Sequence, residues 1–575
     1  MKLNKILLAL GVSALLPATS SCDLDEVFYS ETTPDTFITS EANVYSLMSR
    51  VLAHWKVYLG STRWEGQEMS TDEFICPTRS SGDWANSGYF VRLHSHTWRP
   101  TDSFSNNNYY ESMQGVARCN EVITQLRKTD YGKLGLTSED QADNIAQMET
   151  LKGYFYMRCL DYYGGVPLYE PGEMQNKPRA TARQTFEYCE NIFKNACENL
   201  KPKAGLGTAE EGYLSRAAAA TMLAELYFNA EAYIGEARYT EAAKISQDII
   251  NGVYGPYDLD PDWFGIFSFD NDKSPEMIWC CPSEYNRMEF NWYYRNFMPY
   301  NIKNYMNNSY TNSGFNGYCL APSLDPEGNA YVDTKPEIKL GSPFGKMHKK
   351  DLRKKVYRYN GNGKYTGMFL FGELTNSTTG KTVTGNKEDR GKAINLRDQV
   401  YRYTKVSNPT ASTPSTMTDA DESCGVRLVK FPIPDENDLE MTWKPDFPAI
   451  RLAEVYYMLA ECKFRAGDKK GACDLFNKVR ARNFKNGDDP DPCTVENIDL
   501  YRIADEWMIE FLGEGRRRTD LIRLGFFISE DWWDHKATND KHLLRFPIGE
   551  TQLSANPLLK QNPGYGGEEL TPEEI

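Results

Sequence analysis

The segment that most restricts the fold is residues 453–482, AEVYYMLAECKFRAGDKKGACDLFNKVRAR, where two stretches of helical periodicity meet at a short turn. The turn is Ala466–Gly467–Asp468. A tetratricopeptide repeat of about 34 residues needs small residues where its two helices cross. Ala460 and Ala472 occupy those two positions, and Phe476 takes the aromatic position that follows. The spacing therefore predicts a helical hairpin of the tetratricopeptide type.

Three other segments also have helical periodicity. Residues 215–254 predict a second hairpin of the same kind. Ser215 would cap a helix of small residues, and a partner helix would follow over 239–253. Residues 108–128 and 142–170 predict two long helices, the second of which stops at Gly164–Gly165. Hairpins of this kind stack on their neighbours and share one continuous core. We therefore predict a mainly α fold built on a tetratricopeptide-like helical repeat scaffold.

Two long segments interrupt the helical pattern. Residues 60–108 are rich in aromatic and polar residues, and residues 255–445 are rich in Asn, Gly and Tyr. Because a structureless stretch of that length is uncommon in a compact domain, we expect loop-rich insertions with short strands and helices. The predicted organisation is a helical scaffold over 37–254, a loop-rich ligand-binding subdomain over 255–445, and repeat helices with a C-terminal segment over 446–575.

The first residues have the pattern of a secretory signal. Lys2 and Lys5 precede the apolar run ILLALGVSALL, and small residues lead to Cys22. The run is shorter than the roughly 20 apolar residues that span a bilayer. We predict a lipoprotein signal peptide over 1–21, lipidation of Cys22 and a tether over 22–36. An ordinary signal peptide with an incidental cysteine is the alternative.

Charge and cysteine content limit the partners. The net charge of −15 disfavours a nucleic-acid partner, which needs basic faces. Removing Cys22 from the thirteen cysteines leaves twelve, an even number that permits disulfides, but the chain has no CxxC pair or Cys/His metal spacing. Most of these cysteines are expected in the core. With 36 Tyr, 27 Phe and 11 Trp, some aromatic side chains must lie outside the core.

Exposed aromatic rings suggest where a ligand binds. Sugars present apolar CH faces and polar rims, so a ring beside amide or guanidinium groups suits them. Trp84 lies in SGDWANSGY, a context typical of a loop. A second group lies in the Asn-rich segment, where buried core aromatics are the alternative, and Phe315 could extend it. The predicted ligand-binding residues are Trp84, Trp292, Tyr294, Tyr305, Tyr310, Arg79 and Asn86.

Several polar clusters are candidates for metal or anion sites. The alternation in VRLHSHTW predicts a strand with His94, His96 and Trp98 on one face, but no third ligand is evident and we assign it to the scaffold. FDNDKSPE and NGDDPDP lack the ligand order of an EF-hand. We predict no cofactor and no metal site, and a structural calcium ion stays open and unassigned. The block EGRRRTDLIRLG is expected to neutralise its own charge, through Glu506, Glu510, Glu514 and Asp520 around Arg516, Arg517 and Arg518.

Several blocks taken together resemble the SusD/RagB family of outer-membrane nutrient-binding lipoproteins of Bacteroidetes. They occur in the family's order from end to end of the mature chain: CDLDE, SMQGVARCNEVI, YFYMRCLDYYGGVPLY, IRLAEVYYMLAECKFRAG, FNKVRARN, EFLGEGRRRTDLIRLG and FPIGETQLSANPLLKQNPGY. The resemblance implies that the arginine block and the HSHTW run are structural. It also implies that DLDE after Cys22 acts as a surface-export signal.

The resemblance implies a non-catalytic function. Such a chain would bind oligosaccharides or polysaccharides at the cell surface and deliver them to a SusC-like TonB-dependent transporter in the outer membrane, with a lipid anchor as its only membrane contact. Capture of peptides by the same architecture, as in the RagB branch, is the alternative. A glycosidase needs two carboxylates about 5–10 Å apart, which 80 acidic residues do not exclude. No GxSxG, HExxH or P-loop motif supports catalysis.

Overall fold

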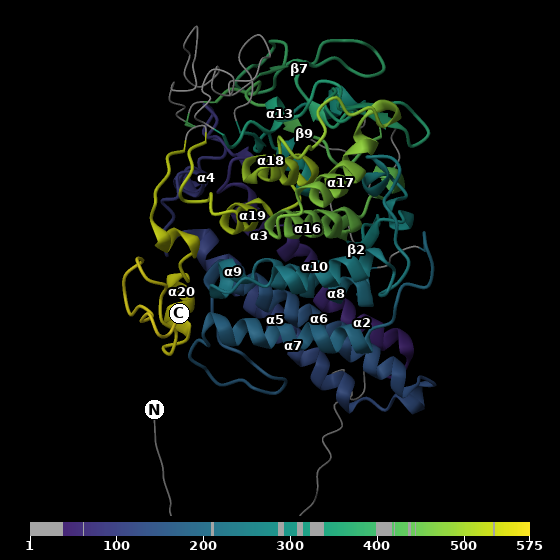
Figure 1. Cartoon of the computed structure of the whole chain (residues 1–575). Coiled ribbons are helices and arrows are strands. Elements are labelled where there is room, and N and C mark those ends of the chain that lie inside the picture. Colours follow the sequence, from purple (N-terminus) through teal and green to yellow (C-terminus); the bar gives the residue numbers. More distant parts are fainter. Residues whose placement is uncertain are drawn as a thin grey trace, which may run out of the picture.

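The long helices of the molecule form one continuous stack. The computed structural model describes residues 38–60, 62–208, 212–285, 292–307, 314–321, 339–397, 417–418, 420–434, 439–442, 444–532 and 535–575. Each helix of the stack packs against the next, and in Figure 1 the stack rises from α7 through α8, α10 and α16 to α17. Its helices are α2 (Glu41–Gly60), α5 (Ser103–Lys128), α6 (Ser138–Tyr163), α7 (Ala182–Asn199), α8 (Arg216–Phe228), α10 (Tyr239–Ile250), α16 (Leu452–Arg465) and α17 (Lys469–Arg480).

Local sequence signals set the ends of these helices. A capping box joins Thr137 to Asp140 at the start of α6, and α6 stops at Gly164, whose φ of 78° suits glycine. Ser215 caps α8 by accepting a hydrogen bond from the amide of Ala218 at 3.3 Å. Asp468 caps α17 in the same way. The predicted stop at Gly164 and the predicted cap at Ser215 are both confirmed.

The hairpin predicted over residues 453–482 is formed by α16 and α17. Ala460, Ala472 and Phe476 are fully buried, as the close crossing of the two helices requires. The second predicted hairpin is formed by α8 and α10, where Ala224 and Ala242 are likewise fully buried. The prediction of a mainly α, tetratricopeptide-like scaffold is confirmed.

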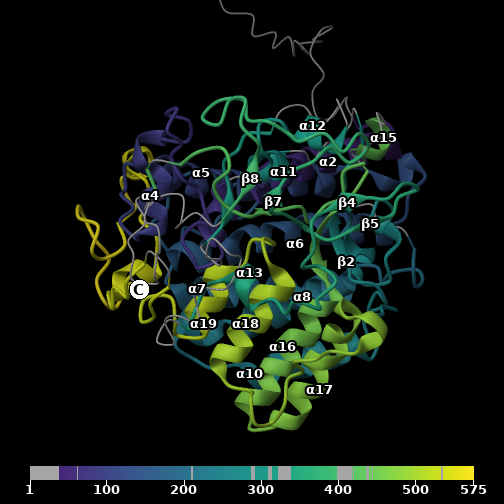
Figure 2. The ribbon, with the colours of Figure 1, turned by 90° about the horizontal axis from the view of Figure 1, so that it is seen from above.

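A loop-rich layer covers one end of the stack, and it is formed by the chain between α10 and α16 together with residues 69–102, which pair with it through β1. Figure 2, seen from above, shows α11, α12, β7 and β8 in this layer. Its antiparallel strand pairs are β1 (Phe74–Ile75) with β3 (Cys319–Leu320), β4 (Arg358–Tyr359) with β5 (Tyr365–Thr366), β6 (Phe369–Leu370) with β9 (Arg427–Leu428), and β7 (Gly372–Glu373) with β8 (Asn395–Leu396). Its short helices are α11 (Trp292–Phe297), α12 (Ile302–Met306), α13 (Pro343–Lys346) and α15 (Leu439–Thr442).

The two ends of the excursion between α10 and α16 are paired with each other. Strand β2 (Met277–Cys281) runs antiparallel to β10 (Phe447–Arg451), which leads directly into α16. The remaining helices are α3 (Thr62–Glu68), α4 (Tyr89–His94), α9 (Ala230–Ile234), α18 (Leu500–Phe511), α19 (Arg517–Arg523) and α20 (Glu550–Ala555).

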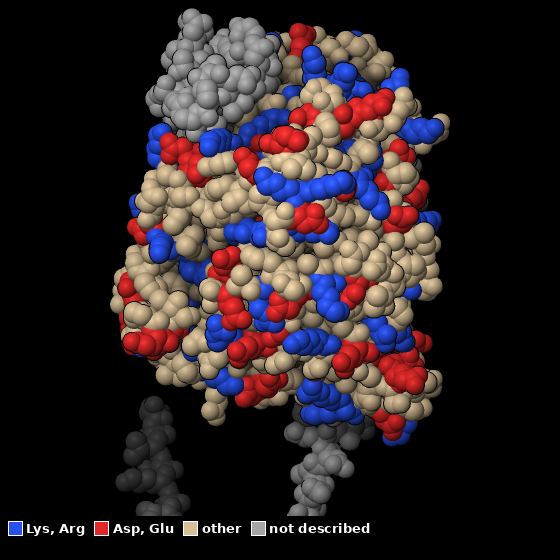
Figure 3. Space-filling model, in the orientation of Figure 1, with Lys and Arg blue, Asp and Glu red and all other residues tan. Residues whose placement is uncertain are grey.

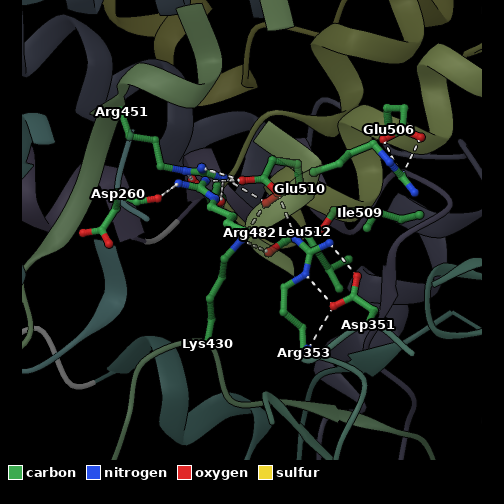
Figure 4. Close-up of polar contacts among 12 residues, drawn as sticks. Asp260, Asp351, Arg353, Lys430, Arg451, Arg482, Glu506, Ile509, Glu510 and Leu512 are labelled. Atoms are coloured by element: carbon green, nitrogen blue, oxygen red, sulfur yellow. Dashed lines mark hydrogen bonds and ion pairs between the residues drawn. The ribbon is translucent and has the colours of Figure 1, made fainter. Parts of the chain in front are cut away.

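A buried ion network joins the layer to α18 and to the segment that follows α17 (Figure 4). Glu510 on α18 accepts hydrogen bonds from Arg353 of the layer at 2.9 Å, and from Arg451 and Arg482 at 2.8 Å each. Burial opposes ionisation of Glu510, but the three guanidinium groups outweigh it and lower the pKa of this carboxyl well below its usual value. We call this set of four residues the Glu510 network.

The arginine block is structural, as predicted, but most of its partners differ from those expected. Asp520 does pair with Arg516, at 2.9 Å. Arg517, however, pairs with Asp72, and the Nη1 atom of Arg518 lies 3.6 Å from Asp161. These acids precede the block by several hundred residues, so helical spacing could not reveal them.

The strand predicted over 91–98 is wrong. This region contains α4, which ends at His94, and then a turn in which His96 has a φ of 54°. Tertiary packing overrides the alternating pattern, because His96 stacks on Phe527 with 4.4 Å between ring centres and lies 4.2 Å from the ring of His535. Among the described residues, no group of three or more His, Cys, Asp or Glu side chains could hold a metal ion.

The surface carries both signs of charge. Figure 3 shows Lys and Arg interspersed with Asp and Glu over the face in view, with no broad area of a single sign. A protein that tracks a phosphate backbone needs such an area of positive charge. Within the described ranges, no helix is both long enough and apolar enough to cross a membrane.

Candidate functional site

The loop Ser80–Gly88 has an unusual backbone. Trp84, Asn86 and Ser87 have φ values of 61°, 39° and 51°, in the left-handed region that side chains with a Cβ disfavour. Hydrogen bonds hold the loop, since the Arg79 amide donates to the Asp83 carbonyl at 2.9 Å and the Ser80 amide donates to the Ala420 carbonyl at 2.8 Å. A strained backbone that its surroundings maintain is typical of a functional site.

The ring of Trp84 is fixed although it is only half-buried. Its indole Nε1 donates to the Phe315 carbonyl at 2.7 Å, and its ring centre lies 5.5 Å from that of Tyr318 and 5.7 Å from that of Phe90. A Cβ on Gly317 would lie 2.4 Å from the indole, so only glycine fits beneath the ring. The tryptophan is therefore a rigid ring with part of its surface open to solvent.

Charged and polar groups border the ring. Asp83 accepts hydrogen bonds from the Lys387 ammonium and the Tyr300 hydroxyl, and that ammonium lies 4.4 Å from the centre of the Tyr300 ring. These two hydrogen bonds, that from Lys387 first, lower the pKa of Asp83 below its usual value. Ser81 donates from its amide to Glu388 at 3.3 Å. The border thus contains a carboxylate that stays ionised at neutral pH and an adjacent ammonium group.

Phe315 adds a second aromatic surface beside the tryptophan. Its side chain is 40% exposed, and the Arg295 guanidinium lies 4.1 Å from its ring centre. Its amide donates to the Arg295 carbonyl at 2.7 Å, which fixes the two residues relative to each other. We call the loop Ser80–Gly88 together with Arg295, Tyr300, Phe315 and Lys387 the Trp84 surface.

Two of the predicted ligand residues are structural instead. Arg79 is 1% exposed, and its guanidinium donates to the carbonyls of Asp421 at 2.8 Å and Gly317 at 2.9 Å. Tyr305 is also 1% exposed, and its hydroxyl donates to the Tyr357 carbonyl at 2.6 Å. Both predictions are corrected, because neither side chain reaches the surface where a ligand would lie. Asn86 is exposed beside Trp84 and stays a prediction.

Other predicted residues lie outside what the structure describes. Helix α11 begins at Trp292, but the side chains of Trp292 and Tyr294 are not among the described ones. Tyr310 and Cys22 also fall outside the described residues. The assignments of these four residues stay predictions.

Sequence reasoning missed the polar border of the site. Lys387 and Glu388 follow the tryptophan by some 300 residues, and nothing in the local sequence links them to it. Tyr300 carried no signal either, because it is one of many tyrosines in the Asn-rich segment. The acid at 83, directly before the tryptophan in SGDWANSGY, was the one available indication.

Two hollows lie elsewhere, on the helical stack. One of about 740 Å³ runs along α5 and is lined by residues including Met113, Ala117, Tyr169 and Met174. The other, of about 550 Å³, is bordered by the exposed rings of Tyr45 and Tyr213. Neither contains a predicted ligand residue, but Tyr213 offers a matched control for the Trp84 surface.

The fold and this surface together define a helical repeat protein with an aromatic surface patch on a loop-rich layer. The family model described as the SusD family matches residues 275–565, just over half of the chain, and the chain belongs to this family. The resemblance drawn from the sequence blocks is confirmed.

Individual relatives cover almost all of the chain. The starch-binding protein SusD of Bacteroides thetaiotaomicron is 23% identical over 529 residues, which are 88% of this chain and 85% of that protein. Among solved structures, NanU of B. fragilis has a TM-score of 0.63 at 18% identity and covers 94% of this chain and 99% of its own. Surface glycan-binding protein A from Bacteroides fluxus has a TM-score of 0.61 at 18% identity, with coverage of 92% and 100%. The structural similarities establish the fold.

Proposed function

We propose that the chain is a non-catalytic binder of oligosaccharides or polysaccharides at the cell surface. The observation that carries the proposal is Trp84, a ring held in a left-handed backbone conformation, fixed by its Nε1 hydrogen bond and left partly open to solvent. The names of two similar proteins, a starch-binding protein and a surface glycan-binding protein, support the same ligand class.

The chemistry of the Trp84 surface suits a sugar. An indole face packs against the CH face of a pyranose, while hydroxyl groups at the sugar's edge need donors and acceptors within reach. Asp83 and Asn86, within two residues of the tryptophan, and Lys387, which donates to Asp83, supply both. A fixed ring also loses little side-chain entropy on binding, which favours affinity.

The proposal places the chain at the outer membrane. Lipidation of Cys22 after removal of residues 1–21 would anchor it to the surface, and a SusC-like TonB-dependent transporter would receive the bound glycan. Tethering a binder beside its transporter raises the effective concentration of a dilute polymer at the pore. No cofactor is needed for binding of this kind.

Affinity electrophoresis tests the proposal directly. Lipid-free protein, residues 23–575, is run through gels containing neutral polysaccharides, beside a Trp84→Ala variant and a Tyr213→Ala control. The proposal is supported if one polymer retards the wild-type protein, if the apparent affinity for that polymer falls at least tenfold in Trp84→Ala, and if it is unchanged in Tyr213→Ala. Loss in both variants, or in neither, contradicts the assigned surface.

The peptide alternative has its own outcome in the same design. If no polysaccharide retards the protein, calorimetry with a mixture of short peptides tests capture of peptides. If binding heat is observed with peptides and no polysaccharide is bound, the ligand class is peptides and not glycans.

A further inference from the structure

Two segments of the loop-rich layer are held together by two buried arginines. Arg427 donates to the carbonyl of Tyr318 at 3.0 Å and to that of Cys424 at 2.7 Å. Arg79 donates to the carbonyls of Gly317 and Asp421, in the same two segments. The two guanidinium groups therefore tie residues 317–318 to residues 421–424.

The backbones of these segments touch at a glycine. Gly425 has a φ of 89°, and a Cβ there would lie 2.4 Å from the Cβ of Cys319 and 2.5 Å from its Sγ. The amide of Leu320 also donates to the Val426 carbonyl at 3.0 Å. The side chain of Cys319 is thus pressed against the residue that follows Cys424.

The two thiols meet inside this contact. Both side chains are fully buried and belong to one small apolar cluster with Ile75, Met417 and Ala420. The Cys424 thiol donates a hydrogen bond to the Cys319 sulfur. Thiols in contact on segments fixed by other bonds meet the main requirement of a disulfide, which is close approach without movement of the backbone.

We propose that Cys319 and Cys424 form a disulfide when the chain folds in the presence of a small-molecule or protein disulfide. The oxidant is required because two electrons must leave the two thiols. The export assumed in the proposed function supplies an oxidising compartment, and this is the one point at which the inference rests on that function.

The electrostatics assign the order of the exchange. Burial opposes ionisation of Cys319, but the hydrogen bond from Cys424 and the guanidinium groups of Arg427 and Arg79 outweigh it and lower its pKa to about 7. Burial raises the pKa of Cys424 well above its usual value. Cys319 is therefore the more readily ionised thiol of the pair, which makes it the better attacking group as the two segments come together.

The steps balance for glutathione disulfide as oxidant. The Cys319 thiolate attacks one glutathione sulfur, which forms a mixed disulfide and releases one glutathione thiolate. Cys424 then loses its proton to that thiolate and attacks the Cys319 sulfur, which releases the second glutathione as a thiolate that takes up the proton Cys319 had lost to water. One disulfide has been reduced to two thiols, and the protein has lost two hydrogens. Because both cysteines are buried, this exchange precedes the final closure of β3 against β9.

The disulfide would act directly beneath the Trp84 surface. Phe315, whose carbonyl holds the indole, and Gly317, which lies under the ring, precede Cys319 by a few residues. Ala420, which receives the Ser80 amide, precedes Cys424 in the same way. The bond would therefore tie together the two segments on which the Trp84 loop rests.

Peptide mapping without reduction tests the proposal. The purified full chain is refolded with reduced and oxidised glutathione, remaining thiols are alkylated, and the protein is digested with trypsin. Cys319 and Cys424 fall in the peptides 304–339 and 406–427, and each peptide contains no other cysteine. A linked species two hydrogens lighter than the sum of the two peptides is expected. Recovery of both as alkylated thiols would overturn the proposal, as would Cys319 linked to Cys76 in peptide 64–79.

Variants extend the test with a matched control. Cys424→Ser should abolish the linked species and lower the thermal midpoint by several degrees, whereas Cys462→Ser, at a buried cysteine of α16, should leave the linked species intact. If Cys424→Ser fails to fold, peptide mapping of the wild-type protein still shows whether Cys319 and Cys424 are linked. Because the mapping involves no glycan, failure of the disulfide and failure of glycan binding are observed separately.

Discussion

The Glu510 network and the Trp84 surface use charge in opposite ways. Around Glu510, three guanidinium groups and a carboxylate are removed from water, and each finds its partner within the protein. Around Trp84, the ion pair of Asp83 and Lys387 stays partly open to solvent beside a half-buried ring. A buried network costs desolvation that only complete pairing offsets, so it fixes one arrangement of the layer on the stack. The partly exposed charged groups around Trp84, in contrast, can still form hydrogen bonds to a ligand.

The largest effect is expected at the centre of the buried network. Glu510→Gln keeps the shape of the side chain but removes its charge, which leaves the three arginines without their common carboxylate. We expect the free energy of unfolding to fall by about 3–5 kcal/mol, measured by denaturant titration. Glu496→Gln, at an exposed site, should change it by less than about 0.5 kcal/mol. Equal effects in both variants would show that the network does not hold the layer.

A second interior effect depends on pH. Burial lowers the pKa of His535 to about 4, and that of His96 well below its usual value. Between about pH 6.5 and 4 the unfolded chain binds protons that the folded protein excludes, so stability falls as the pH drops through this range. For His535 alone the loss is about 3 kcal/mol.

The measurement is denaturation at a series of pH values for the wild-type protein and for His535→Phe. The phenyl ring can keep the stacking on Trp532, where the ring centres lie 3.8 Å apart. The variant should show a flatter dependence on pH between 6.5 and 4. An unchanged slope would mean that His535 does not titrate differently in the two states.

A smaller effect separates strain from binding at the Trp84 surface. Trp84→Gly and Trp84→Ala both remove the ring, but only glycine adopts a φ of 61° without steric strain. We expect the glycine variant to be the more stable by about 1 kcal/mol, while both lose polymer retention equally. If alanine were the more stable, the left-handed backbone would not persist without the ring.

The smallest effect is expected at the open ion pair. Asp83→Asn removes the charge that Lys387 meets, and a pair of this exposure contributes less than about 1 kcal/mol to folding. Denaturation should therefore barely change, and gel retardation should weaken less than in Trp84→Ala. A loss of retention as large as that of Trp84→Ala would place Asp83, and not the ring, at the centre of binding.

The sequence predicted the stack well because its signals are local. Small residues at Ala460 and Ala472, the cap at Ser215 and the stop at Gly164 each act within a few turns of helix. The strand expected around His96 failed for the opposite reason. Its alternation was accidental, and contacts with Phe527 and His535, more than four hundred residues later, decided the backbone.

The site could be predicted only in part. Trp84 had an unmistakable loop context, but the burial of Arg79 and Tyr305 depends on which distant carbonyls face them. Residue type suggested ligand contacts for both, and three-dimensional packing gave them other partners. Lys387 reaches the site through a fold of the layer that no local pattern encodes.

The pairing of β2 with β10 has an evolutionary consequence. The long excursion leaves and rejoins the stack through neighbouring strands, so its entry and exit are fixed by main-chain hydrogen bonds that depend little on side chains. Loops that start and end on such a fixed frame tolerate insertion and replacement better than the elements that carry them. A layer attached in this way can change in length or surface without a change in the packing of the helices beneath it.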